Sequence, residues 1–379
     1  MVYLIKEENM SEFKKLGIKA DLIKGLKELN IVEPSKIQQQ VIPILLNQDT
    51  DLVGQAQTGT GKTAAFGLPL LQKIDTSKDS IQALVLCPTR ELGQQVAKQF
   101  FKFTKYTDKI FTTAVYGGEK IELQIERLRR VNHIIVATPG RLLDLIRRKD
   151  IDIRDVHTLV MDEADEMLSM GFKKDLDSIL KVMSKVRNKW LFSATLPNEI
   201  KAMVNRHLSP EAFRIEVNKK QLVNKDIDHK FVICDELDKL NVLLQFLKSE
   251  TKNRGVIFCK TKAATQKLAQ QLQAKNISAD AIHGDLKQKE RDKVMRAFKN
   301  ENLRMLVATD LAARGIDISG LSFVVHYQLP DQIEYYTHRS GRTARAGKKG
   351  IALAIVTSKD MKNLRYIEKN LAINFKQVR

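Results

Sequence analysis

The sequence predicts an α/β protein with two domains in tandem, each a mostly parallel sheet covered by helices. Short apolar runs alternate with amphipathic stretches along the chain, which is typical of parallel strands joined by crossover helices. The segment 218–227 is polar and lacks a clear period, so it is the predicted linker between domains of residues 1–217 and 228–379. A length of 379 residues suits two domains of ordinary size.

The predicted strands are short apolar runs that follow one another in order. In the first domain they are Leu52–Val53, Ala83–Cys87, Thr113–Tyr116, Ile134–Ala137, Leu159–Met161, Trp190–Phe192 and Phe213–Val217. In the second they are Lys230–Ile233, Val256–Cys259, Ala279–Ile282, Met305–Ala308, Phe323–Tyr327 and Ile351–Val356. Because helical stretches separate them, successive strands should lie parallel and be buried on both faces.

Composition narrows the class of protein. The formal net charge of +19 favours a polyanionic partner, nucleic acid first, although a solvated basic surface has the same signature. The cysteines Cys87, Cys234 and Cys259 are far apart and fit neither a disulfide framework nor a zinc site. The sequence has no membrane-length apolar run, and its N-terminal apolar run is too short for a secretory signal. We therefore expect a soluble, cytoplasmic protein.

A glycine-containing loop follows the first predicted strand. Gly59 and Gly61 allow the backbone to turn tightly and to approach phosphate oxygens with its N–H groups. Lys62 would reach the β- and γ-phosphates, and the Thr63 hydroxyl would bind Mg²⁺. A plain glycine turn before a helix is the alternative. The predicted nucleotide-binding loop consists of Ala56, Gln57, Thr58, Gly59, Thr60, Gly61, Lys62 and Thr63.

Two carboxylates follow the buried run that ends at Met161. Asp162 would lie at the carboxyl end of a parallel strand, where such sheets bind ligands, and is the predicted Mg²⁺ ligand. Glu163 would orient and deprotonate the attacking water. A solvated acidic turn is the alternative for the tetrad alone, but its combination with Lys62 and Thr63 predicts a site of nucleoside triphosphate hydrolysis.

Further motifs occur in a fixed order along the chain. They are Pro88-Thr89-Arg90-Glu91-Leu92, Gly117-Gly118, Thr138-Pro139-Gly140-Arg141, Ser193-Ala194-Thr195, Val256-Ile257-Phe258-Cys259, Ala308-Thr309-Asp310, Ala313-Arg314-Gly315-Ile316-Asp317 and His338-Arg339-Ser340-Gly341-Arg342-Thr343-Ala344-Arg345. With Asp162-Glu163-Ala164-Asp165, the set resembles the motifs of the DEAD-box RNA helicases, from about Phe13 to about Ile367. The resemblance implies two tandem RecA-like domains with ATP and RNA bound at the cleft between them.

The resemblance also implies roles for single residues around ATP. In the adenine-reading segment, about residues 11–39, Gln38 would read the adenine edge and Phe13 would pack against the base. The implied arginine fingers are Arg342 and Arg345, and His338 would link the two domains. The remaining implied roles are ribose binding by Asp317 and coupling of the site's state through Asp165, Ser193 and Thr195.

The RNA partner would be held by its backbone, without preference for base sequence. The implied contacts are Arg90, Gly118, Thr138, Arg141, Arg291 and Thr309, each of which taken alone could equally be a helix cap or a turn residue. Accessory proteins are possible partners, and a monomer is the default expectation.

The implied function is RNA-stimulated ATP hydrolysis that drives domain closure and opens short duplexes or remodels ribonucleoprotein. An ATP-gated RNA clamp with little unwinding shares every motif, and a DNA translocase or a non-catalytic nucleotide switch are further alternatives. The chain departs from the family pattern at Asn30-Ile31, where Gly-Phe is usual, and at Ala344, where Gly is common. Neither departure removes a catalytic group.

Overall fold

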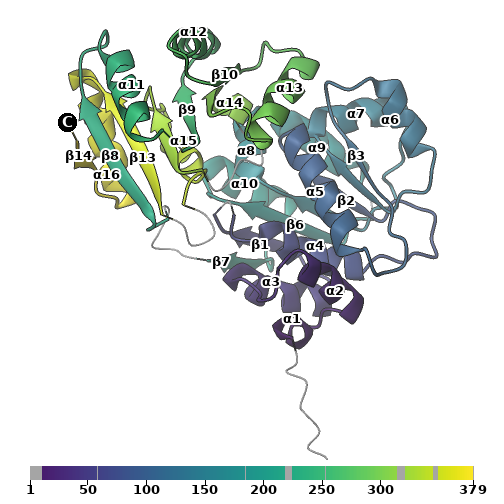
Figure 1. Cartoon of the computed structure of the whole chain (residues 1–379). Coiled ribbons are helices and arrows are strands. Elements are labelled where there is room, and N and C mark those ends of the chain that lie inside the picture. Colours follow the sequence, from purple (N-terminus) through teal and green to yellow (C-terminus); the bar gives the residue numbers. More distant parts are fainter. Residues whose placement is uncertain are drawn as a thin grey trace, which may run out of the picture. The chain divides into compact units, whose positions relative to one another are not determined.

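The computed structural model describes residues 11–57, 59–183, 185–217, 224–251, 253–313, 321–344 and 349–378. The chain divides into two compact units, Met1–Val217 and Asn218–Arg379 (Figure 1). The predicted linker falls mostly on residues outside the described ranges, and its last position, Ile227, is the first residue of a strand. Among the described residues, no helix is both long enough and apolar enough to cross a bilayer.

Unit 1 contains a seven-stranded sheet in the order β3-β4-β2-β5-β6-β1-β7. Its strand pairs are all parallel, as the alternation of strands and helices predicts. The strands are β1 (Leu52–Gln55), β2 (Ala83–Leu86), β3 (Thr112–Val115), β4 (Ile134–Ala137), β5 (Thr158–Met161), β6 (Asn188–Ser193) and β7 (Phe213–Glu216). Strand β6, which pairs with β1, carries the fully buried Trp190.

Helices cover both faces of this sheet, because alternate strand residues point to opposite faces (Figure 1). On one face Leu84 and Leu159 pack with the helices α7 to α10, and on the other Val85 and Val160 pack with α2 to α5. The helices are α1 (Glu12–Lys15), α2 (Ala20–Glu28), α3 (Lys36–Asn47), α4 (Lys62–Gln72), α5 (Arg90–Phe103), α6 (Ile121–Leu128), α7 (Pro139–Arg147), α8 (Ala164–Ser169), α9 (Lys173–Val182) and α10 (Asn198–His207).

Unit 2 contains a second seven-stranded sheet in the order β10-β11-β9-β12-β13-β8-β14. Its strands are β8 (Ile227–Ile233), β9 (Gly255–Cys259), β10 (Ala279–Ile282), β11 (Met305–Thr309), β12 (Phe323–His326), β13 (Gly350–Val356) and β14 (Lys376–Gln377). Its helices are α11 (Lys239–Ser249), α12 (Lys262–Gln273), α13 (Gln288–Lys299), α14 (Asp310–Ala313), α15 (Ile333–Ser340) and α16 (Met361–Leu371), with a 3₁₀ turn at Ser358–Asp360. The sequence analysis missed β14, whose two polar, exposed residues carry no strand pattern.

The two sheets have the same topology. Numbered by appearance within each unit, their strands lie in the order third, fourth, second, fifth, sixth, first, seventh. In both sheets the loops that follow the strands therefore emerge in the same order along one edge, the carboxyl edge. This edge positions the predicted site residues, since ligands bind outside the carboxyl ends of parallel strands.

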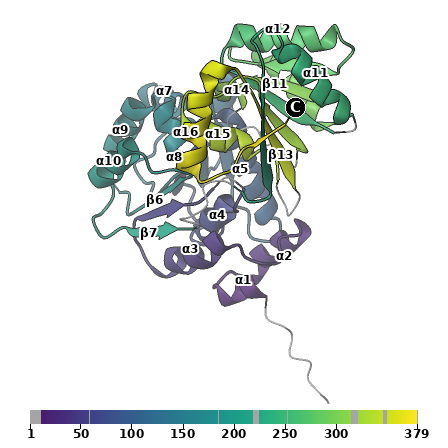
Figure 2. The ribbon, with the colours of Figure 1, turned by 90° about the vertical axis from the view of Figure 1, so that its left-hand side faces the viewer.

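The N-terminal helices α1 to α3 pack as one group in unit 1 (Figures 1 and 2). Helix α2 ends at Glu28, and two residues later Asn30 adopts a left-handed φ of 56°. The N–H of Ile31 then bonds the Leu26 carbonyl at 3.0 Å, and the N–H of Asn30 bonds the Lys27 carbonyl at 3.0 Å. This is the Schellman arrangement that usually takes glycine, and asparagine is the non-glycine residue that tolerates it best. The departure at Asn30 therefore leaves the helix end intact.

Candidate functional site

The glycine-containing loop joins β1 to the N-terminus of α4. Gly59 and Gly61 have φ values of 85° and 91°, a region that side-chain-bearing residues rarely adopt. Lys62 is the first residue of α4 and is buried, and its Nζ donates to the Ala56 carbonyl at 2.8 Å. The Thr60 hydroxyl donates to the Gln57 carbonyl at 2.7 Å, while Thr58 lies outside the described residues. The loop thus connects a strand through a tight turn to a helix N-terminus, and this arrangement is suited to binding phosphate.

Gln38 holds this loop from outside. Its Nε2 donates to the Gly61 carbonyl at 3.0 Å, and its Oε1 accepts from the Ser35 N–H at 2.9 Å. A Cβ at Gly61 would lie 2.4 Å from the Gln38 Nε2 and displace this carboxamide, and the φ of 91° there would strain any residue other than glycine. The carboxamide keeps one further N–H and one lone pair, which is the pair of groups that adenine recognition requires.

Phe13, the residue expected to pack against the base, is only 1% exposed. Its ring belongs to the hydrophobic cluster formed by α2 to α5 and one face of the sheet. A ring without a free face must change its packing before it can stack on a base. Base packing by Phe13 therefore stays a prediction that requires local rearrangement.

The two carboxylates follow β5, which is buried along its whole length. Burial, together with the neighbouring carboxylates of Glu163 and Asp165, raises the pKa of Asp162 to about 7, although the Lys62 ammonium and the Glu163 N–H act in the opposite direction. Glu163 has a left-handed φ of 52° at the N-terminus of α8, a strained conformation of the kind that clusters at functional sites. Its N–H donates to Asp162 Oδ1 at 3.0 Å.

Asp165 connects these carboxylates to β6. Its Oδ2 accepts from the Thr195 N–H at 2.9 Å and from the Thr195 hydroxyl at 2.7 Å. The Ser193 Oγ accepts from the Asp165 N–H at 3.2 Å and donates to the Thr195 carbonyl at 2.7 Å. These contacts are the physical basis for the predicted coupling by the three residues.

The predicted RNA contacts of unit 1 lie after β2, β3 and β4, the strands at the other end of the same sheet edge. Arg90 is the first residue of α5, and its guanidinium lies 5.1 Å from the centre of the Tyr116 ring. Gly118 has a φ of 84° in the turn after β3. Thr138 precedes α7 without capping it through its hydroxyl, and Arg141 donates to the Glu119 carbonyl at 3.2 Å. One edge thus carries the phosphate loop and carboxylates on β1, β5 and β6, and the RNA candidates on β2 to β4.

In unit 2 the RNA candidates Thr309 and Arg291 meet at α14. The Thr309 hydroxyl accepts from the Ala312 N–H at 3.4 Å, and Arg291 donates to the Ala312 carbonyl at 2.7 Å. The helix-cap alternative is therefore realised for Thr309, and a role in RNA binding would be additional.

Arg339 is a residue to which the sequence analysis gave no role. It is 1% exposed, and it donates to both carboxylate oxygens of Asp310 at 2.5 and 2.7 Å and to the Gln328 carbonyl at 2.7 Å. This buried ion pair ties α15 to α14. The sequence analysis recognised the motif around His338. Only the tertiary structure shows that Arg339 is the arginine of this motif that is buried in an ion pair.

Arg342 follows α15, beside Thr343, which forms an isolated parallel bridge with Leu321 just before β12. It therefore lies toward the amino ends of the strands, whereas Thr309 lies at their carboxyl ends. His338 lies within α15 and is half-buried. Asp317 and Arg345 lie outside the described residues.

Comparison with known proteins gives two family matches. Residues 35–203 match the model described as DEAD/DEAH box helicase, and residues 238–347 match that of the helicase conserved C-terminal domain. The DEAD-box ATP-dependent RNA helicase CshA of Bacillus cereus is 42% identical over 360 residues, which is 95% of this chain and 68% of that protein. The ATP-dependent RNA helicase CshA of Listeria monocytogenes is 43% identical over the same shares of the two chains.

The chain belongs to the DEAD-box family of ATP-dependent RNA helicases.

Solved structures agree with the RecA-like fold of this helicase. Saccharomyces cerevisiae Dbp5 bound to RNA and ADP BeF3 matches with a TM-score of 0.89 and 32% identity, covering 97% of this chain and 95% of that one. A DEAD box protein from Methanococcus jannaschii is 39% identical, with a TM-score of 0.56 and coverage of 97% and 99%. The tandem RecA-like architecture predicted from the sequence is therefore confirmed.

One departure from the family pattern has a structural cost in this helicase. Ala344 adopts a φ of 54°, which glycine adopts without strain and alanine does not. The residue lies two positions after Arg342, and its carbonyl accepts a hydrogen bond from the Asn224 side chain. The turn that carries the predicted finger is thus held in a strained conformation by its surroundings.

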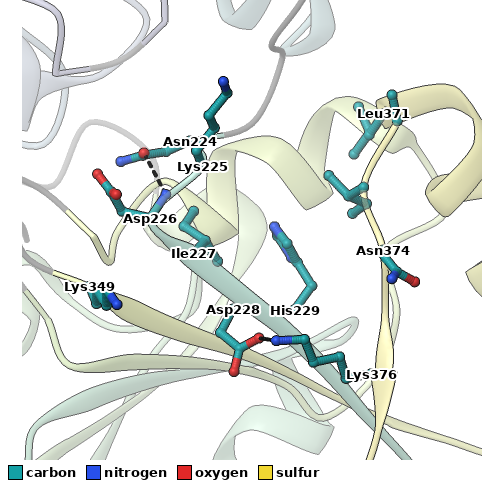
Figure 3. A pocket seen from close by; sticks show the side chains of 12 residues that line it. Asn224, Lys225, Asp226, Ile227, Asp228, His229, Lys349, Leu371, Asn374 and Lys376 are labelled. Carbon is teal, nitrogen blue, oxygen red and sulfur yellow. Dashed lines mark hydrogen bonds and ion pairs between the residues drawn. The ribbon is translucent and has the colours of Figure 1, made fainter.

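A cavity of about 600 Å³ opens at the amino end of β8 (Figure 3). Lys225, Lys349 and the ion pair between Lys376 and Asp228, 2.9 Å long, lie around it. His229 also lines it, and the Nδ1 of His229 lies 2.7 Å from the Tyr336 hydroxyl of α15. Of the predicted site residues that the structure describes, none lines this cavity.

Proposed function

We propose that this helicase hydrolyses ATP when RNA is bound, and that the hydrolysis cycle grips and releases one RNA strand. The observation that carries the proposal is the shared carboxyl edge in unit 1. The phosphate loop after β1, the carboxylates after β5 and the RNA candidates after β2 to β4 all lie along it. Nucleotide and RNA would then bind to one rigid sheet and influence each other through it.

On the nucleotide side, Lys62 would bind the β- and γ-phosphates together with the N–H groups of Gly59 to Thr63. Mg²⁺ favours oxygen ligands and is held mainly by one or two carboxylates plus substrate phosphates, so Asp162 and the Thr63 hydroxyl fit it without a protein cage. Among the described residues, no three His, Cys, Asp or Glu side chains gather as a self-sufficient metal site. When bound, the ion would neutralise developing phosphate charge, and Glu163 would orient and deprotonate the attacking water.

Unit 2 would complete the site only in a closed state. Arg342 and Arg345 would then stabilise charge on the γ-phosphate, Asp317 would accept from the ribose, and His338 would contact the carboxylates. RNA bound by Arg90, Gly118, Thr138, Arg141, Arg291 and Thr309 would favour the same closed state, so RNA and ATP would promote each other's binding. Gripping and bending one strand would open a short duplex locally, and phosphate release would reverse the closure.

The decisive experiment measures ATP turnover without nucleic acid, with single-stranded RNA, and with single-stranded DNA of matched sequence. Glu163→Gln serves as the blank, and Glu166→Gln, which changes the neighbouring buried carboxylate, serves as the matched control. We expect stimulation by RNA alone, loss of turnover in Glu163→Gln by roughly a hundredfold or more, and nearly normal turnover in Glu166→Gln. Turnover that ignores RNA would contradict the proposal.

A duplex assay on the same preparations separates the two modes of action. Release of the short strand of an RNA duplex at a rate that depends on ATP supports strand opening. Slow release of single-stranded RNA with ATP bound, without duplex opening, would instead favour the clamp.

A further inference from the structure

The strand β3 lies at the open edge of the unit 1 sheet and leads directly into the Gly117-Gly118 turn. Its Val115 carbonyl accepts from the Thr138 N–H at 3.1 Å, on the side of β4. Because backbone groups alternate in direction along a strand, the N–H and C=O of Tyr116 point the other way, to the edge without a neighbouring strand. Buried backbone groups of this kind need partners from elsewhere.

The side chain of Gln124 supplies both partners. Its Oε1 accepts from the Tyr116 N–H at 3.1 Å, and its Nε2 donates to the Tyr116 carbonyl at 2.9 Å. The same Nε2 donates to Glu119 Oε2 at 3.0 Å. Gln124 projects from α6 and is fully buried, so its carboxamide replaces the missing strand at this one residue and also reaches across the turn.

The two residues that Gln124 holds in turn contact the predicted RNA-binding arginines. The Tyr116 ring lies under the Arg90 guanidinium at 5.1 Å, and the Tyr116 hydroxyl accepts from Gln94 Nε2 at 2.6 Å. The Glu119 carbonyl accepts from Arg141 Nη2 at 3.2 Å. Gly118 lies between the two held residues. Three predicted RNA contacts on separate loops are therefore linked to one buried carboxamide.

The carboxylate of Glu119 is itself fixed. Arg127, one turn after Gln124 on α6, donates to both of its oxygens at 3.1 and 2.5 Å. Partial burial raises the pKa of Glu119, but the hydrogen bonds and charge of Arg127 outweigh it and leave the pKa below its usual value. Glu119 therefore stays ionised and accepts from the Gln124 Nε2. Because an ionised carboxylate can only accept, residue 124 must supply an N–H donor.

We propose that Gln124 is a positioning residue for RNA binding: it fixes the Tyr116–Glu119 turn so that Arg90, Gly118 and Arg141 present one rigid surface to the RNA backbone. The proposal rests on the RNA-binding role given to those three residues above. Gln124 has no contact with the phosphate loop or the carboxylates after β5 in the contacts described for it. Its loss should therefore weaken RNA binding and leave ATP chemistry intact.

The chain offers a matched control at the opposite edge of the same sheet, where the strands begin. Gln82 is also buried, and its carboxamide also clasps one backbone residue: Nε2 donates to the Asp75 carbonyl at 2.7 Å, and Oε1 accepts from the Asp75 N–H at 2.9 Å. Gln82 precedes β2 and so lies at the amino ends of the strands, away from the RNA candidates. Substitution of Gln82 by glutamate removes the equivalent bond donated to a backbone carbonyl without touching the proposed surface.

The test compares Gln124→Glu with Gln82→Glu in the full chain. Glutamate keeps the shape of glutamine but cannot donate to a carbonyl, and at position 124 it also faces the Glu119 carboxylate. Gln124→Met, which removes all three hydrogen bonds without adding charge, is the second variant in case the first does not fold. The measurements are RNA-free ATP turnover, KM for ATP, turnover at saturating RNA, the concentration of single-stranded RNA that gives half-maximal stimulation, and the unfolding temperature.

We expect the Gln124 variants to need about tenfold more RNA for half-maximal stimulation, the size expected when a buried polar group loses its partner. Their RNA-free turnover and KM for ATP should be unchanged, and the Gln82 variant should need normal RNA concentrations at a similar loss in unfolding temperature. An equal increase in Gln82→Glu would overturn the proposal, because general loosening of unit 1 would then explain both.

Arg141→Ala separates failure of this inference from failure of the proposed function. If Arg141→Ala raises the RNA requirement and neither Gln124 variant does, Gln124 has no positioning role, although the surface is correct. If Arg141→Ala also leaves the RNA requirement unchanged, the proposed RNA surface itself is wrong, and the role of Gln124 falls with it.

Discussion

The two sheets share one strand order, yet the loops after their first strands have different chemistry. In unit 1, β1 leads through the glycine-containing loop to Lys62, the first residue of α4. In unit 2, β8 leads through Cys234-Asp235-Glu236-Leu237-Asp238 to Lys239, the first residue of α11. Both lysines are buried at the start of the helix that follows the first strand. The fold thus places a cation at the same point twice.

What differs is how each charge is compensated. Lys239 pairs with Glu236 at 2.9 Å and lies 3.8 Å from an Asp360 oxygen, so protein carboxylates neutralise it. Lys62 donates to the Ala56 carbonyl, a neutral group, and acts electrostatically on Asp162. A buried charge held by a neutral oxygen favours an incoming anion, whereas a paired one serves the fold. The same position is therefore suited to phosphate binding in unit 1 and to structure in unit 2.

The strands at the other end of the two sheets are more alike. Thr89 caps α5 after β2 and Thr261 caps α12 after β9, each through its hydroxyl. Gly118 follows β3 and Gly284 follows β10, and Thr138 and Thr309 stand at the ends of β4 and β11. This half of the edge is thus alike in both units, as the proposed RNA contacts of both units would require, while the nucleotide half is built in unit 1 alone.

The largest test of this contrast exchanges each lysine for alanine. Lys62→Ala should lower ATP turnover by at least roughly a thousandfold, because the loop loses its cation for the β- and γ-phosphates. Lys239→Ala should leave turnover per folded molecule within about twofold, but it should destabilise unit 2, since Glu236 and Asp360 lose their partner. Steady-state ATPase assays and thermal unfolding of both variants check this. Similar turnover in the two variants would remove the distinction between the loops.

The next test concerns the contribution of unit 2 to hydrolysis. Arg342→Ala should reduce turnover at saturating RNA by roughly a hundred- to a thousandfold and change KM for ATP by less than about threefold, because a finger acts mainly on the transition state. Arg365→Ala, which removes an exposed arginine paired with Glu368 on α16, is the control for general charge loss. Normal turnover in Arg342→Ala would refute its role as an arginine finger.

A smaller effect is expected from salt, and it addresses the shared half of the edge. The cationic RNA candidates are Arg90, Arg141 and Arg291, so the slope of log affinity for single-stranded RNA against log salt should be about −2. Raising salt from about 50 to 200 mM should then weaken RNA binding by roughly tenfold to twentyfold. Fluorescence anisotropy with labelled RNA measures the slope, and Arg141→Ala should make it less steep by about 0.7. A flat response would contradict backbone recognition.

The smallest effect is a difference in acid stability between the units. Burial lowers the pKa of His229 from 6.5 to about 4, and burial and Arg339 lower the pKa of His326 well below its usual value. Below about pH 6.5 the unfolded chain takes up protons that folded unit 2 does not, so the free energy of unfolding of unit 2 decreases as the pH is lowered. For His229 alone, the loss of stability from pH 7 to 5.5 is about 1 kcal/mol. In unit 1, burial also lowers the pKa of His133 and of His157, but the pKa of Asp162 is raised to about 7, mainly by burial, and its protonation offsets their effect.

The single tryptophan, Trp190, reports on unit 1 alone, whereas circular dichroism reports on both units. We therefore expect urea unfolding at pH 5.5 to show an early transition in circular dichroism without a matching change in tryptophan fluorescence. His229→Gln should reduce the separation of the two transitions. If the two urea transitions coincide at pH 5.5, and if their midpoints shift equally between pH 7 and pH 5.5, the units do not differ in acid stability.

Particular residues show how far prediction from the sequence reached. The strands were found because buried parallel strands are continuous apolar runs, and the loop from Ala56 to Thr63 because its glycines and lysine stand at fixed spacing. β14 was missed because its pairing with β8 depends on an available sheet edge and not on its own residues. Arg339, Gln124 and Lys239 gave no signal because a charged or polar residue in a helix is usually exposed, and only burial reveals its partners.

The two α/β units, the family and the types of side chain available at the strand ends could all be predicted from the amino-acid sequence. These features can be predicted because apolar strand segments, glycine turns and the order of the motifs are local patterns of the amino-acid sequence. Tertiary structure alone decided which polar groups are already engaged: Gln38 on the phosphate loop, Thr309 on α14, Phe13 in the core and Gln124 beneath the RNA candidates. Those engagements join residues distant in sequence, and their energies depend on burial that no local pattern records.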